Sequence, residues 1–283
     1  MFGRIGEAGY VLSTRELIFL AGLTGAKELH GIEDNTYELE KEELKNEWKK
    51  VKINLLNKRY IQCDKDKITV DRELFLLIDA CCNPKVYIKY TNLDMGNLKH
   101  LRNMYITEKI AVEIDKSRQS HNNWILTPLV NIGKVANNLS ECFITKKEYE
   151  SVDNYFEVSI RDFFQLDQTI KKNNKEDVYK LLSQFGMSND IAKDYIKAYE
   201  KNSVKTLMTM ITDSEGKKDM QTLWLLEGKN YMWKTEALNF DLLIKNEENK
   251  IKIGTVNCQQ IVSEIEDMVC NYSNIFLSAM CQE

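Results

Sequence analysis

The chain has 283 residues, of which 43% are hydrophobic and 29% charged, the balance of an ordinary globular protein. Its formal net charge of −4 argues against attraction of the whole protein to nucleic acid, but it does not exclude local basic patches. No apolar stretch approaches the roughly 20 residues of a membrane-spanning helix, and no signal-peptide pattern opens the chain, so we expect a cytosolic protein without membrane insertion.

The N-terminal region predicts helices followed by a hairpin and a further helix. Ser13 and Glu16 match a capping box, so a first helix should begin near Thr14. A long, charged helix over residues 40–57 is indicated by apolar residues at helical spacing. They are Leu44, Trp48, Val51 and Leu55. The runs 60–63 and 67–70 read as a small hairpin, and Asp71 can cap the next helix. This order is typical of a winged-helix-like unit.

The rest of the chain alternates between β-rich and helical sections. Strands are expected from residue 86 to residue 126, and a short helix should begin at Asn131. Helices follow in the second half, where Ile160, Phe163, Phe164 and Ile170 are expected to share one face. Strands and turns run from residue 204 to residue 253, and a last helix should begin after Asn257.

Two distant stretches, residues 129–135 and 255–261, read alike and are 126 positions apart. Each joins the end of an apolar run to an Asn suited to cap a helix, and each follows a strand, a polar turn and a second strand. Chance similarity between short strands is the alternative. We interpret the pattern as a diverged repeat, because the order of elements agrees as well as the residues.

An α+β architecture follows from this repeat. Two isolated small sheets would leave four exposed edges, whereas one continuous sheet pairs two of them. We therefore predict a pseudo-two-fold central antiparallel sheet flanked by helical bundles, with a winged-helix-like N-terminal part. The chain is expected to be a single domain built of two halves, residues 1–145 and 146–283.

No constellation of residues points to catalysis. His30, His100 and His121 are scattered in polar surroundings, and no phosphate-binding loop or nucleophile elbow is present. The seven cysteines show no Cys-x-x-Cys spacing and are expected to be buried thiols, the vicinal pair Cys81 and Cys82 included. We predict no catalytic residue, no metal site and no cofactor. An active site assembled from residues distant in sequence remains a third possibility beside the two binding functions that follow.

DNA binding is the main alternative to protein binding. Between Lys41 and Arg72 the chain carries ten basic and six acidic residues, a local net charge of +4 that suits phosphate contacts. Against it, Glu42, Glu43 and Glu47 lie at the start of the helix that would enter the groove. Winged helices also serve as protein-binding or structural units.

The segment 223–233 predicts a partner-binding surface. Leu223, Trp224, Leu226, Tyr231 and Trp233 place large apolar side chains on both faces of a strand pair, more than one core face buries. Either helices cover both faces, or the excess faces a partner. Aromatic residues of this kind are common at the centre of protein interfaces.

The layout resembles a known family. A helix start of the form Leu-Ser-x-x-Glu-Leu at residues 12–17, a sheet, the helix from Asn131 and the same plan again through Asn257 are similar to the EspG-like chaperones of type VII (ESX/WXG100) secretion and related Firmicutes proteins. The resemblance covers nearly the whole chain, without a diagnostic motif. The charged helix over residues 40–57 departs from what an actinobacterial member would show.

The resemblance implies a cytosolic adaptor for helical-hairpin, WXG100-like secretion substrates. In that family the central sheet and the C-terminal helical part contact the substrate. This points to the hairpin already described and to Ile261 and Ile265 of the last helix. The predicted partner-binding residues are therefore Leu223, Trp224, Leu226, Tyr231, Trp233, Ile261 and Ile265. The oligomeric state stays open.

Overall fold

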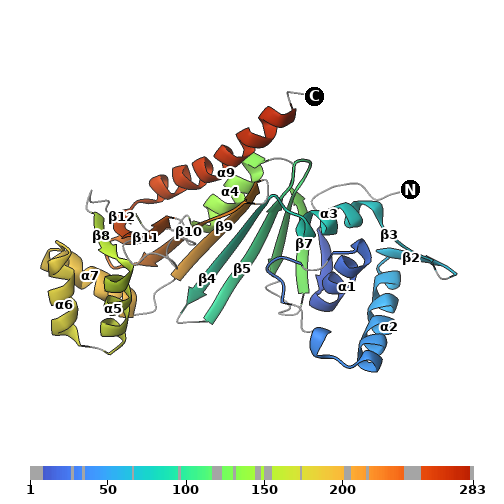
Figure 1. The fold of residues 1–283 in the computed structure, drawn as a ribbon, viewed down its shortest axis with the longest axis horizontal. Helices are drawn as coiled ribbons and strands as arrows, with labels where there is room; N and C mark the ends of the chain where they lie inside the picture. Colours follow the sequence, from blue (N-terminus) through green and yellow to red (C-terminus); the bar gives the residue numbers. More distant parts are fainter. Residues whose placement is uncertain are drawn as a thin grey trace. The chain divides into compact units, whose positions relative to one another are not determined.

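The computed structural model describes most of the chain. The described residues are 9–26, 29–33, 36–65, 67–94, 97–116, 123–129, 132–143, 148–149, 155–172, 174–200, 205–214, 217–238 and 250–280. They divide between two compact units, one of residues 1–87 and 102–132, the other of residues 88–101 and 133–283. Figure 1 labels the helices and strands described below and colours them along the chain.

The first unit begins with a helical part. Its elements are β1 (Tyr10–Ser13), α1 (Thr14–Thr24), the short 3₁₀ helix η1 (Thr36–Glu38), α2 (Lys41–Asn57), the hairpin β2 (Ile61–Asp64) and β3 (Lys67–Val70), and α3 (Arg72–Cys82). The predicted order of helices, hairpin and helix is confirmed.

Capping chemistry explains where α1 begins and ends. The Glu16 amide donates to Ser13 Oγ at 3.2 Å, and the Ser13 amide donates to Glu16 Oε2 at 2.7 Å, so the predicted capping box is present. Gly25 at φ 84° ends the helix in the left-handed region that glycine adopts without a Cβ penalty. Lys58, just after α2, holds the buried Glu16 with Nζ–Oε distances of 2.7 and 2.9 Å and so ties α2 to α1.

Four strands of an antiparallel meander follow. They are β4 (Val86–Asp94), β5 (Asn97–Ile106), β6 (Ala111–Lys116) and β7 (Asn123–Leu129). The first unit contains the parts of β4 and β5 outside residues 88–101, which belong to the second unit. β1 pairs with β7, where Leu12 lies opposite Trp124, and both side chains are buried.

The second unit repeats this plan. Its elements are α4 (Ile132–Phe143, from residue 133 on), β8 (Tyr155–Ser159), α5 (Ile160–Lys171), α6 (Lys175–Gln184), α7 (Asn189–Glu200), β9 (Lys205–Ser214), β10 (Lys217–Glu227), β11 (Met232–Leu238), β12 (Lys250–Val256) and α9 (Cys258–Met280). Ser159 caps α5 and bonds Asp162, as Ser13 caps α1 and bonds Glu16.

The strands are hydrogen-bonded in the order β1-β7-β6-β5-β4-β9-β10-β11-β12-β8. From one end the order is β1, which precedes the first helical bundle, and then the following meander in reverse, β7-β6-β5-β4. From the other end it is β8, which precedes the second bundle, and then β12-β11-β10-β9. The prediction of a large antiparallel sheet with helical bundles in an α+β fold is confirmed, and the structure shows that the strand order repeats as well. The division at residues 145 and 146 and the assignment to a single domain stay predictions.

Of the two asparagines predicted to cap helices, the structure describes only Asn257. Asn257 caps α9, since its Oδ1 accepts from the Gln260 amide at 2.8 Å and Gln260 Oε1 accepts from the Asn257 amide at 2.9 Å. Asn131 lies outside the described residues, although α4 begins directly after it. The turn near residues 247–249 is also outside them.

Candidate partner-binding site

Five of the seven predicted residues lie on the paired strands β10 and β11 or at their turn. Leu226 lies opposite Trp233, and Trp224 lies opposite Thr235. Because opposite residues share a face and neighbours along a strand alternate, Trp224, Leu226 and Trp233 point to one face, and Leu223 points to the other. We call these the bundle face and the α9 face.

Helices α5, α6 and α7 cover the bundle face. Trp233 is fully buried, with its ring centroid 5.0 Å from that of Tyr195 on α7. Trp224 packs edge-on against Phe163 of α5 at 5.9 Å and is also 6.2 Å from the Tyr199 ring. Edge-to-face pairs at such distances add to the stabilisation from burial. Most of the apolar excess on this face therefore lies against the chain's own helices.

Asp194 of α7 fixes the turn between the two strands. Its carboxylate is 5% exposed and accepts from Trp233 Nε1 at 3.1 Å and from the Asn230 amide at 2.9 Å. The turn closes with the Gly228 amide donating to the Tyr231 carbonyl at 2.8 Å. A helix carboxylate thus sets the position of the predicted aromatic hairpin.

The same bundle contains a tyrosine and carboxylate pair. Tyr199 Oη donates a short hydrogen bond to Asp167 Oδ1. Burial, and then this bond, raise the pKa of Tyr199 well above its usual range. Burial likewise raises the pKa of Tyr195. Both hydroxyls therefore stay protonated at neutral pH, and that of Tyr199 acts as a structural donor to Asp167.

Helix α9 covers the other face. Ile261 and Ile265 are both 0% exposed, and Leu223 is 3% exposed. Lys234 of β11 reaches Glu264 of α9, with 2.6 Å between Nζ and Oε1, and it also pairs with Glu236. The ion pair between this nearly buried lysine and Glu264 holds α9 against the strand pair.

Most of the predicted partner-binding residues are thus buried. Leu223, Leu226, Trp233, Ile261 and Ile265 lie inside the second unit, whereas Trp224 and Tyr231 are partly exposed. The alternative that helices cover both faces describes the strand pair better than a fully open surface does. Whether these residues bind a partner stays a prediction.

An apolar strip beside Trp224 was missed. Leu207 of β9 lies opposite Trp224 and is 38% exposed, and Ile211 lies opposite Met220 on the same face, both partly exposed. Phe164 of α5 is 59% exposed, whereas Ile160 and Phe163 are partly buried and Ile170 is buried, so the prediction that all four share one face is wrong at Phe164. Alternation in the run 205–214 was the available signal, because apolar residues occupy both of its faces.

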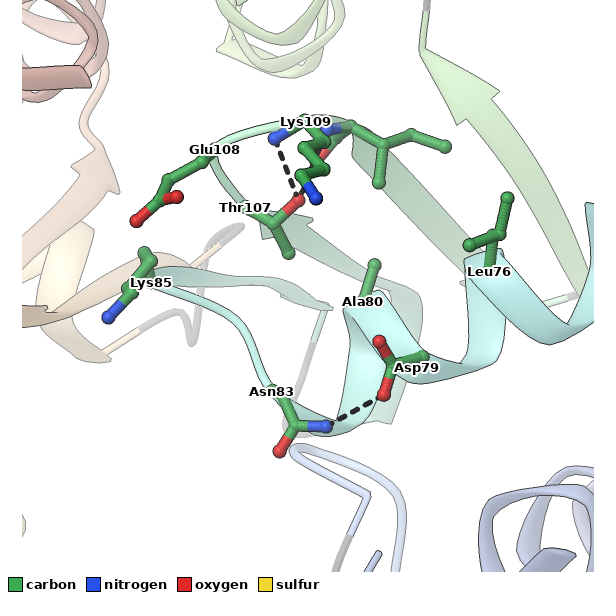
Figure 2. Close-up of a pocket in the computed structure, with 9 residues that line it drawn as sticks. Leu76, Asp79, Ala80, Asn83, Lys85, Thr107, Glu108 and Lys109 are labelled. Carbon is green, nitrogen blue, oxygen red and sulfur yellow. Dashed lines mark hydrogen bonds between the residues drawn. The ribbon is translucent and has the colours of Figure 1, made fainter. Parts of the chain in front are cut away.

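The hollow in Figure 2 is a different kind of feature. It lies in the first unit between the end of α3 and the β5–β6 turn, with a volume of about 250 Å³. It is lined by Leu76, Asp79, Ala80, Asn83, Lys85, Thr107, Glu108, Lys109 and Ile110. Asn83 donates to Asp79 at 2.9 Å, and Thr107 Oγ1 accepts from the amides of Lys109 and Ile110. These polar groups satisfy one another, so we assign no ligand to the hollow.

Other chemistry is sparse in the described ranges. Within them, no three His, Cys, Asp or Glu side chains are grouped to hold a metal ion. No helix of the described part is both long and apolar enough to cross a lipid bilayer. Cys81 and Cys82 are buried and reduced, whereas Cys63 is exposed, contrary to the expectation of burial. Burial raises the pKa of Cys82 to about 11, which makes it a poor nucleophile.

The basic part of the first unit is partly neutralised by its own acids. Lys45 pairs with Glu42 and Lys50 with Glu47, each at 2.7 Å, and Lys58 is held by Glu16. Three of the ten basic residues counted there are therefore already paired. This weakens the charge argument for DNA binding, which stays an untested alternative.

Together these observations define an α+β protein with a large antiparallel sheet, a three-helix bundle in each unit and a partly exposed apolar strip. The fold is similar to that of EspG5, a type VII secretion system chaperone of Mycobacterium tuberculosis, in the structure of its complex with the PE25–PPE41 dimer. The TM-score is 0.65 with 8% sequence identity, over 91% of this chain and 94% of that chain. No protein-family model and no curated protein matches the sequence.

Proposed function

We propose that this chain is a cytosolic chaperone or adaptor for helical-hairpin substrates of type VII secretion. The shared fold supports a role of this class, since EspG5 is a secretion chaperone and the similarity extends over nearly the full length of both chains. The proposed substrate is a small helical protein of the WXG100 type. Binding needs no cofactor and no covalent step.

The observation that carries the proposal is the apolar strip on the bundle face. Leu207, Ile211, Met220 and Trp224 lie on one face of the paired strands β9 and β10, and each keeps part of its surface exposed. Such a strip at the edge of a helical bundle suits the apolar stripe of an amphipathic helix. The contact masks the stripe reversibly, as a carrier must.

The seven predicted residues divide into two roles under this proposal. Trp224 and Tyr231 reach the partner directly. Leu223, Leu226 and Trp233 support them from the strands, while Ile261 and Ile265 keep α9 packed behind the strip. Changes at the five buried residues should therefore act through stability rather than through contact.

A co-expression experiment tests the proposal. Leu207→Ser and Ile211→Ser change exposed or half-exposed side chains and should leave the far-UV circular dichroism spectrum and melting temperature nearly unchanged. Wild type should co-purify with a tagged WXG100-like protein of the source organism and co-elute in size exclusion. The Leu207→Ser/Ile211→Ser variant should weaken this complex by about tenfold or more, the order expected for an apolar anchor at an interface.

The matched control is Leu76→Ser, which removes a similarly large exposed side chain from α3 in the first unit. It should leave the complex intact. If wild type binds none of the WXG100-like proteins, the proposed substrate is wrong. If the strip variant binds as wild type does, the proposed surface is wrong.

A further inference from the structure

The C-terminal half of α2 carries an exposed surface that neither the fold nor the proposed function uses. We call it the α2 patch and define it as Lys49, Lys52, Ile53, Leu56 and Arg59, of which Lys52 is half-buried and the others are exposed. The four helical members are spaced i, i+3, i+4 and i+7, so they share one face of the helix. Ile53 is 58% exposed and Leu56 is 36% exposed.

The charge of this patch has one sign. No acidic residue occurs from Lys49 to Arg59. Lys50 and Lys58 in that stretch are used by Glu47 and Glu16. For Lys49, Lys52 and Arg59, the described part of the chain provides no ion pair. Within the described residues, the patch therefore combines two exposed apolar side chains with three basic ones that have no ion pair.

The backbone at Arg59 adds an independent observation. Arg59 adopts φ 60° in the turn that ends α2, where the Tyr60 amide donates to the Leu55 carbonyl at 2.9 Å and the Arg59 amide to the Leu56 carbonyl at 3.0 Å. This is the position where helices prefer glycine, because a Cβ is strained there. Attraction between a cation and the helix C-terminus is one reason for an arginine, but it does not explain the exposed Ile53 and Leu56 beside it.

We propose that the α2 patch docks an acidic, amphipathic segment of a partner protein. Ile53 and Leu56 would take its apolar side chains, while Lys49, Lys52 and Arg59 would pair with its carboxylates. The charge complementarity commits the site to an acidic occupant. The apolar pair favours a peptide over duplex DNA, because phosphates would offer nothing to Ile53, and Glu42, Glu43 and Glu47 would repel them at the start of α2.

The site lies on α2 of the first unit and shares no residue with the apolar strip of the second. It acts independently of the proposed substrate, for example as the contact that passes a loaded adaptor to an acidic segment of another protein. Failure of one proposal leaves the other standing.

Fluorescence anisotropy with synthetic probes tests the docking site. The probe is a labelled 16-residue helix with leucines along one face and glutamates around it; the comparison ligands carry lysine in place of glutamate or are a 20-base-pair DNA duplex. The glutamate peptide should bind saturably and weaken as salt rises, because part of the binding is electrostatic. The lysine peptide should not bind.

Variants of the full chain assign the binding to the patch. Ile53→Ser/Leu56→Ser and Lys49→Glu/Lys52→Glu should each weaken it by about tenfold or more. The control Lys180→Glu/Lys197→Glu makes the same charge change on exposed lysines of α6 and α7 and should leave binding unchanged. Arg59→Gly should raise the melting temperature, because glycine adopts positive φ without strain, and it should also weaken peptide binding. If Arg59 had only a structural role, the substitution would not weaken binding.

Three results would overturn the inference. The first is no saturable binding of the glutamate peptide by wild type. The second is wild-type affinity in the Ile53→Ser/Leu56→Ser variant with an unchanged circular dichroism spectrum. The third is tighter binding of the duplex than of the peptide, lost in the Lys49→Glu/Lys52→Glu variant, which would make the patch a nucleic-acid site.

Discussion

Replacing Asp194 by alanine should destabilise the second unit strongly. The carboxylate is 5% exposed and accepts from Trp233 Nε1 and from the Asn230 amide. Without it, the indole N–H of a fully buried tryptophan has lost its acceptor, at a cost of about 1–3 kcal/mol. The Asn230 amide is only partly buried and can turn to water, so its loss adds about 0.5–1.5 kcal/mol. The expected total is about 1.5–4.5 kcal/mol.

Asp194→Asn separates charge from shape. The amide keeps the volume but has one acceptor oxygen where two donors converge, so we expect a loss of about 1–2 kcal/mol. Gly228 also lies close to the Asp194 carboxylate, because a Cβ on Gly228 would lie 1.9 Å from Asp194 Oδ2. Gly228→Ala should therefore push the carboxylate away and mimic part of the Asp194→Ala effect.

The assay is urea unfolding followed by far-UV circular dichroism, with Trp233→Phe as the partner change. Trp233→Phe keeps an aromatic ring and removes the donor, so the double variant Asp194→Ala/Trp233→Phe should lose less than the sum of the two. A coupling of about 1–2 kcal/mol is expected for residues in direct contact. The reasoning is refuted if Asp194→Ala costs less than about 0.5 kcal/mol or if the two changes are additive.

Three further predictions concern the first unit. Gly31→Ala should lower the free energy of unfolding, measured by urea titration, by at least about 1 kcal/mol more than Gly25→Ala. Both glycines have positive φ, but a Cβ on Gly31 would lie 2.0 Å from Tyr87 Oη and break the hydrogen bond from Tyr87 to Asn103, whereas a Cβ on Gly25 would meet nothing within 4 Å. Glu16→Ala should cost about 1 kcal/mol more than Asp162→Ala, whose carboxylate accepts from the Ser159 hydroxyl at the start of α5, because Glu16 also binds Lys58; equal costs would contradict this. Burial raises the pKa of Cys82 to about 11 from 9.0, so the folded state holds this proton more tightly and stability should fall as pH rises from about 9 through 11. Cys82→Ser should show a smaller fall in urea midpoints over that range, and an identical fall would count against the burial argument.

Local chemistry made much of the fold predictable. The capping boxes at Ser13 and Asn257, the hairpin after α2 and the left-handed Gly186 at φ 89° all follow from short-range rules that a sequence displays directly. The repeat also predicted one continuous antiparallel sheet, whereas the order of strands within it comes from the structure.

The candidate site was harder to predict because burial is a property of tertiary packing. The aromatic hairpin 223–233 has the composition of an interface, yet Asp194, Tyr195 and Phe163 come from helices more than 25 positions away in the chain and enclose it. Conversely, Leu207 and Phe164 look like core residues and are exposed. Apolar alternation predicts that a residue faces a sheet surface, but which part of that surface a helix covers depends on helix length and angle.

Comparison of the two halves sharpens the functional argument. A repeated plan makes α1, α2 and α3 equivalent to α5, α6 and α7, so differences between them are not needed for the fold itself. α2 has 17 residues against 10 in α6, and it is followed by the β2–β3 hairpin where α6 is followed only by a short turn. Counted from the start of the helix, the seven additional residues of α2 are 51–57, which include Lys52, Ile53 and Leu56, and Arg59 follows two positions after its end. This stretch contributes Val51 and Leu55 to the core, but it also carries the exposed Ile53 and Leu56 beside basic residues for which the described part of the chain provides no ion pair. Such exposed apolar side chains are the expected signature of a second binding surface.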